Sequence, residues 1–66
     1  MTPEIIKNME TERIADIFIM TGSIKRKNIQ IVRGWLMDEM ERRNPEGFDK
    51  WLDSDCYDED IKKYIM

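Results

Sequence analysis

Cys56 is the only cysteine of the 66-residue chain, and no histidine is present to act as its base. Nucleophilic catalysis needs a nucleophile next to a base. The neighbouring carboxylates of Asp53, Asp55 and Asp58 disfavour the negatively charged thiolate, which is the reactive form. Carboxylate pairs need a desolvating cleft for acid–base work, and such a cleft is hard to build in so small a domain. We therefore expect Cys56 to be partly buried and unreactive, and the protein not to be an enzyme.

The same acidic segment begins like a calcium-binding loop, because Asp53 and Asp55 have the spacing of the first two ligands. Tyr57, however, stands where the third oxygen ligand belongs. Asp58 replaces the required glycine, and Tyr64 replaces the closing glutamate. The segment therefore predicts a solvated turn, and nothing in the sequence indicates a metal, a cofactor or a small-molecule substrate.

A basic segment consists of Lys25, Arg26 and Lys27, with Arg33 beyond it. It follows a glycine turn, as the second helix of a helix-turn-helix does. That motif has a small residue four places before the turn glycine, and here Phe18 occupies the position. The sequence pI of about 4.8 also argues against a nucleic-acid domain, because such domains are usually basic. We keep a small dimeric DNA-binding or transcriptional regulatory protein as the alternative function. Such a protein would contact phosphates through this basic segment.

The net charge of −3 is unevenly distributed along the chain. Residues 1–33 carry six basic and four acidic side chains, whereas residues 34–66 carry five basic and ten acidic ones. This asymmetry suits a contact of basic on acidic surface, between subunits or with a partner protein. We nevertheless favour the interpretation that both regions are solvated faces, because surface charges ordinarily have no partner.

The N-terminal region starts with Thr2, Pro3 and Glu4, which provide a hydroxyl cap, a proline at the first helical position and an acid in the first turn. Apolar residues then predict either one helix to about Met20 or two helices with a break near Thr11. The glycine at position 22 predicts a left-handed C-cap at the end.

A long helix is predicted from about Ile24 to Arg43, with Ser23 as its N-cap. Its apolar residues occupy an arc of about 180°, which is wider than packing against one neighbour requires. The helix should therefore be central and contact two other elements. Gly34 lies inside it at a cost of about 1 kcal/mol relative to alanine, which predicts a close helix crossing beside Trp35.

The run Asn44–Pro45–Glu46 predicts the end of the long helix and the start of the next one. A last helical segment follows, capped at residues 54–55 or at Asp58. We therefore predict a single all-α domain over residues 1–66, a compact bundle of three to five helices. Its predicted core contains Ile14, Ile17, Phe18, Val32, Trp35, Leu36, Phe48, Trp51, Leu52 and Ile61. The alternative is an α+β fold with a hairpin of residues 17–20 and 29–32, which are rich in β-formers.

The apolar supply is large, because ten isoleucines, six methionines and two tryptophans belong to a chain of only 66 residues. A chain of this length buries only about 60% of its unfolded surface. We therefore expect a homodimer, with adaptable methionines available to a second protein partner. The residues predicted to make these contacts are Ile29, Trp35, Met37 and Met40. The sequence lacks an apolar run of about 20 residues and a signal-peptide pattern, so we expect no membrane association and a cytoplasmic location.

Residues 33–52 contain Arg-Gly-Trp followed by Asn-Pro-Glu-x-Phe-x-x-Trp. This third of the chain resembles a segment of short uncharacterised proteins encoded by prophages and conjugative elements of Gram-positive bacteria. The resemblance implies a bacterial cytoplasmic setting and a role accessory to the maintenance of a mobile element or to interference with the host. It implies no activity and no catalytic residues.

Overall fold

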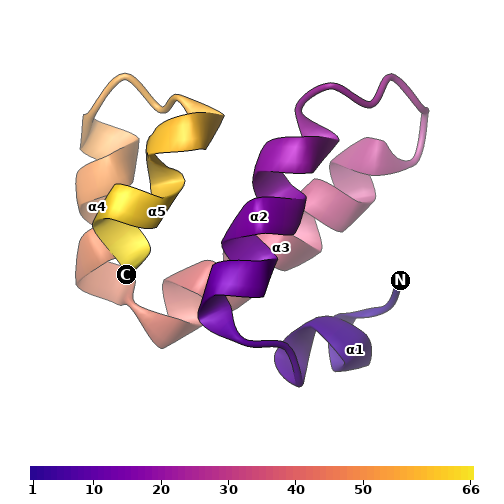
Figure 1. Ribbon diagram of the computed structural model, residues 1–66, viewed down its shortest axis with the longest axis horizontal. Helices are drawn as coiled ribbons and strands as arrows, with labels where there is room; N and C mark the ends of the chain where they lie inside the picture. The colour runs from indigo at the N-terminus through magenta and orange to yellow at the C-terminus, as the bar shows by residue number, and fades with distance from the viewer.

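The computed structural model describes all residues from 1 to 66, and it contains α-helices, one short 3-10 helix and no strands (Figure 1). The predicted all-α bundle is confirmed. The alternative hairpin is wrong, because residues 17–20 are helical and residues 29–32 open the longest helix. The elements are α1 (Pro3–Lys7), α2 (Thr11–Thr21), α3 (Ile29–Arg43), α4 (Pro45–Asp53), the 3-10 helix η1 (Asp58–Asp60) and α5 (Ile61–Ile65).

Helix α3 is the central element, because it contacts α1, α2 and α4. In Figure 1, α2 lies in front of α3 and α1 lies at their lower end, while α4 and α5 form a second pair of helices beside them. The α2–α3 loop and the α4–η1 loop both lie at the upper end of this view. Segments that carry opposite charge in the sequence therefore lie at the same end of the molecule.

The N-terminal region forms two helices, as the alternative with a break near Thr11 predicts. Thr2 caps α1, since its hydroxyl accepts a hydrogen bond from the Ile5 amide at 3.4 Å. A helix of five residues is too short to be stable alone. The fully buried side chain of Ile6 therefore anchors α1 to the bundle.

The start of the long helix is predicted wrongly, because α3 begins at Ile29 and residues 22–28 form a loop. The Ser23 hydroxyl donates to the Met20 carbonyl at 3.0 Å, so it extends the end of α2 and does not cap α3. Gly22 is not a left-handed cap either, since its φ is −60°. A Cβ at Gly22 would lie against the Asp58 carboxylate, so the glycine permits a close approach between two loops.

Six of the ten predicted core residues are buried, and three others pack against the core while partly exposed. Leu52 is the exception: it is 48% exposed, because Phe48 and Trp51 already present the inner face of α4. Trp51 contacts the Phe18 ring edge-on at 5.8 Å between centroids, which joins α4 to α2. The buried core residues absent from the prediction are Ile6, Ala15, Met40 and Ile65.

Asn44 joins the start of α4 to the end of α5, which confirms the predicted boundary at residues 44–46. Its Oδ1 accepts from the Gly47 amide at 2.9 Å, and its Nδ2 donates to the Ile65 carbonyl at 3.1 Å. One side chain thus satisfies a free donor of α4 and a free acceptor of α5. Gly47 allows the approach, because a Cβ there would lie far inside van der Waals contact with the Tyr64 backbone.

Gly34 does not lie at a close crossing within the chain, contrary to the prediction, because a Cβ built on it meets nothing within 4 Å. Replacing Gly34 with alanine removes the backbone entropy cost of an internal helical glycine without a clash. We expect Gly34→Ala to raise the free energy of unfolding by about 0.5–1 kcal/mol. Urea unfolding at submicromolar protein concentration measures it, and a loss of stability would mean that the position is crowded.

Candidate interaction surface

Arg33 fixes the upper end of the bundle by joining α3, α2 and η1. Its guanidinium donates to both carboxylate oxygens of Asp58, at 3.1 and 3.0 Å, in a bidentate pair. It also donates to the Thr21 hydroxyl at 2.8 Å and lies 4.3 Å from the centroid of the Phe18 ring. These partners engage both terminal nitrogens of the guanidinium, and Asp58 balances its charge. The role of Arg33 as a phosphate contact stays a prediction, which these internal contacts argue against.

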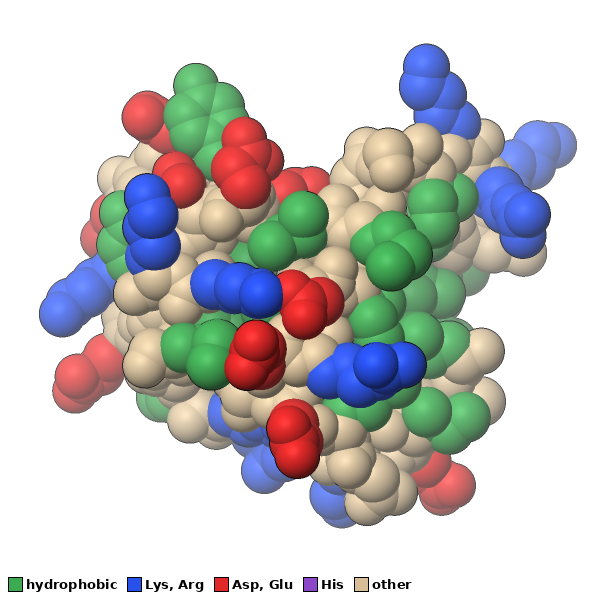
Figure 2. Space-filling model, viewed as in Figure 1, with side chains coloured by type: hydrophobic (Ala, Val, Ile, Leu, Met, Phe, Trp, Pro, Cys, Tyr) green, Lys and Arg blue, Asp and Glu red, His purple; other side chains and the backbone are tan.

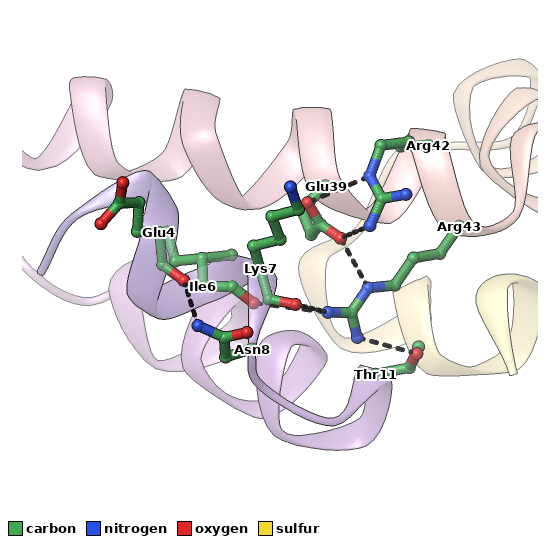
Figure 3. Close-up of polar contacts among 8 residues, drawn as sticks. All are labelled: Glu4, Ile6, Lys7, Asn8, Thr11, Glu39, Arg42 and Arg43. Carbon is green, nitrogen blue, oxygen red and sulfur yellow. Dashed lines mark hydrogen bonds and ion pairs between the residues drawn. The ribbon is translucent and has the colours of Figure 1, made fainter.

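Arg43 has the corresponding role at the lower end (Figure 3). It donates to the Lys7 carbonyl at 2.9 Å and to the Thr11 hydroxyl at 3.2 Å, so it joins the end of α1 and the start of α2 to α3. It also donates to Glu39 one turn earlier, at 2.7 Å. The two arginines hold α3 against its neighbours and so determine which face of α3 remains free.

Glu39 receives hydrogen bonds from two arginines, and the bond from Arg42 is the main cause of its lowered pKa (Figure 3). Desolvation opposes this effect, and Arg43 adds to it. A carboxyl whose pKa is lower in the folded state than its ordinary value of 4.5 stabilises the fold above that pH. The stabilisation is lost as the pH falls through the lowered pKa.

We therefore expect the stability advantage of the native protein over Glu39→Gln to be full above the ordinary pKa of 4.5 and to decrease progressively as the pH falls below it. Urea unfolding of both proteins across this pH range measures the difference. Glu46→Gln is the matched control, because Glu46 is exposed and forms no ion pair. An advantage independent of pH would contradict the assignment.

The basic loop, Lys25–Lys27, lies between α2 and α3. The prediction that this segment begins the long helix is wrong. All three side chains are exposed and form no ion pair. Figure 2 shows Lys and Arg side chains gathered at the upper right, where this loop lies. A hollow of about 290 Å³ adjoins it, lined by Arg26, Lys27, Asn28, Ile29 and Val32.

The acidic loop, residues 53–60, lies at the opposite side of the same end, where Figure 2 shows Asp and Glu side chains gathered beyond a notch. Cys56 belongs to this loop and is exposed, so its predicted partial burial is wrong. The chain turns sharply here, since the φ of Cys56 is +57°. No group of three or more acidic or cysteine side chains is placed to hold a metal ion.

The residues predicted to contact a partner have different positions on α3. Ile29, Trp35 and Met37 are half-buried and reach the surface. Met40 is fully buried in the core, so the prediction that it contacts a partner is wrong. Ile31 is 55% exposed and was missed, although it lies at the edge of the apolar arc that the sequence indicates.

Apolar side chains elsewhere on the surface are also uncovered. Met20 is 61% exposed at the end of α2, and Leu52 and Tyr57 are about half exposed near the acidic loop.

No helix of the structure has the length and apolar character needed to cross a membrane. The chain matches no protein-family model, no curated protein and no solved structure.

Proposed function

We propose that the protein is a non-enzymatic interaction module that acts as a homodimer. The observation that carries this proposal is the set of apolar side chains that reach the surface of the central helix, since Ile31 is 55% exposed and Trp35 and Met37 are half-buried. A helix held on three sides by its own chain ordinarily presents polar residues on its fourth side. Covering this apolar surface with a second polypeptide removes it from water and stabilises the pair.

Sedimentation equilibrium between about 1 and 100 μM tests the proposal, since affinities in this range are typical of small or weak interfaces. We expect the apparent mass to rise from 8.0 kDa towards twice that value as the concentration increases. A mass of 8.0 kDa at every concentration would contradict homodimerisation.

Binding of nucleic-acid phosphates is the second candidate function, and the three exposed, unpaired cations of the basic loop favour it. Binding through phosphates alone is independent of base sequence and weakens steeply with salt. A generic DNA duplex at about 50 mM salt is the probe. The triple charge reversal Lys25→Glu/Arg26→Glu/Lys27→Glu should abolish any binding, and no binding by the native protein would exclude this candidate.

The resemblance of residues 33–52 to mobile-element proteins supports a further part of the proposal, a bacterial cytoplasmic role accessory to such an element. Neighbouring genes test this role. A relaxase, an integrase or a restriction system beside the gene would each indicate a different second partner, whereas an unrelated chromosomal neighbourhood would argue against it.

A further inference from the structure

The upper end of the molecule presents two loops of opposite charge, one on each side of a notch (Figures 1 and 2). The three cations of the basic loop are exposed and form no ion pair. Two carboxylates of the acidic loop, those of Asp58 and Asp60, pair with cations of the same chain. The other three, those of Asp53, Asp55 and Glu59, are exposed and form no ion pair. Each loop therefore presents three charges that one copy of the chain leaves uncompensated.

The spacing of the two loops is fixed by contacts beneath them. Arg33, in the N-terminal half of α3, donates to Asp58 of the acidic loop and to Thr21 at the end of α2. Gly22 approaches the same carboxylate so closely that a Cβ there would overlap it. A surface that is ordered in advance loses less conformational freedom when a partner binds. The upper end is therefore a preorganised surface with one sign of charge on each side.

Apolar groups accompany the charges on both sides of the notch. In the acidic loop, the exposed Tyr57 lies between Asp55 and Glu59 in the sequence. The hollow next to the basic loop is lined by Ile29 and Val32 as well as by two of the three cations. An aromatic ring packs favourably against apolar atoms and against cations. The two loops therefore complement each other in apolar character as well as in charge.

We propose that two copies of the chain pair end to end, with the basic loop of each copy against the acidic loop of the other. This inference rests on the proposed homodimer and specifies its surface. A two-fold axis perpendicular to the plane of Figure 1 brings the loop on the left of one copy onto the loop on the right of the other, and it does so twice. Tyr57 of each copy then lies at the hollow of the other. Ile31, the exposed residue in the first turn of α3, follows the basic loop directly.

Other pairings of the same end satisfy fewer charges. A horizontal two-fold axis in the plane of Figure 1 would bring like loops together, basic on basic and acidic on acidic. A head-to-tail arrangement would leave one loop of each terminal copy free and would continue into an open chain. Because both loops lie at one end of the molecule, the proposed pairing closes after two copies.

Charge exchange between the loops tests the pairing. The triple reversal of the basic loop described above makes both loops acidic, and Asp53→Lys/Asp55→Lys/Glu59→Lys makes the acidic loop basic. We expect each variant to raise the dissociation constant of the dimer by at least about tenfold, because like charges then face each other at both contacts. The variant that combines the two reversals should dimerise as the native protein does, because opposite charges meet again.

Asp38→Lys/Glu41→Lys/Asp49→Lys is the matched control for the acidic-loop reversal. It changes the net charge by the same amount, and its three carboxylates are also exposed and unpaired, but they lie in α3 and α4. The control should leave the dissociation constant close to the native value.

Tyr57 tests the apolar part of the contact. Tyr57→Ser should raise the dissociation constant about tenfold, because a buried aromatic side chain near the centre of an interface contributes much of its binding energy. Tyr57→Phe retains the ring and should dimerise as the native protein does. The melting temperature of the dilute monomer should change little in both variants, since the ring is exposed in one copy.

Sedimentation equilibrium of this set gives distinguishable outcomes. A native protein that stays monomeric overturns both the homodimer and its proposed surface, and DNA binding by that monomer would assign the basic loop to nucleic acid. A native dimer that both loop reversals leave intact overturns the end-to-end surface alone. Weakening by the matched control, with no effect of the loop reversals, would also overturn it and would assign the contact to α3 or α4. A mass that rises beyond twice that of one copy would overturn the closed two-fold pairing.

Discussion

Gly47→Ala is expected to reduce the free energy of unfolding by about 3 kcal/mol, which is most of what a single core of this size supplies. The added methyl group would lie 2.9 Å from the Tyr64 carbonyl carbon and closer still to its oxygen. The obstacle is backbone, so no side-chain rotation relieves it. Far-UV circular dichroism during urea unfolding measures the loss.

The clash has only two ways to relax, and both are costly. If α5 moves away, Ile61 and Ile65 lose their burial, which is worth about 1.5–3 kcal/mol for each fully buried side chain. If α4 moves instead, Asn44 loses its hydrogen bond to the Ile65 carbonyl. Either movement removes contacts that hold the C-terminal helix in place.

Gly34→Ala is the matched control for this prediction, because the chemical change is identical and the site is also helical. Alanine at position 34 meets nothing and should stabilise the dilute protein, whereas alanine at position 47 meets the backbone of another helix. Similar effects of the two substitutions would show that helix propensity dominates, and would contradict the close approach of α4 and α5.

The helix starts that depend on neighbouring residues were predictable from the sequence. Thr2 with Pro3, and Asn44 with Pro45, are caps whose donors and acceptors lie within four residues, and the structure uses both pairs. The residues 22–28 were not predictable in the same way, because Ile24 continues the helical spacing of α3 into the loop. The hydroxyl of Ser23 can either donate to a carbonyl at the end of α2 or accept from an amide as the N-cap of the next helix. The sequence does not show which of these two bonds forms.

The candidate surface was predicted only in part, for a physical reason. Ile29, Trp35 and Met37 reach the surface, but the burial of Met40 depends on how the other helices pack against α3. That arrangement depends on arginine contacts across 25 residues for Arg33 and up to 37 for Arg43. Nothing local marks these arginines as structural, so Arg33 was grouped with the basic loop beside it. The sequence likewise does not show that Gly34 faces open space, so the predicted close crossing beside Trp35 is wrong.

Arg33→Met is expected to reduce the free energy of unfolding by about 2–3 kcal/mol, although methionine retains much of the apolar stem. The substitution removes the bidentate pair with Asp58 and the contact with the Phe18 ring, and it leaves the partly buried Asp58 carboxylate without its cation. Arg33→Lys should recover less than half of the loss, because an ammonium group cannot reproduce the planar fork. Urea unfolding of the three proteins measures this order.

Arg42→Met is the control on the same helix. Arg42 also pairs with a carboxylate, that of Glu39, but its side chain is 61% exposed against 23% for Arg33, so its removal should reduce the free energy of unfolding far less than Arg33→Met does. A double-mutant cycle of Arg33→Met with Asp58→Asn should give a coupling of about 1–2 kcal/mol. If Arg33 were instead a surface cation held ready for phosphate, the coupling would be close to zero and both arginine substitutions would have the same small effect. The size of the coupling thus decides between a structural arginine and a phosphate-binding one, and with it whether the basic surface at this end of the molecule extends beyond Lys25–Lys27.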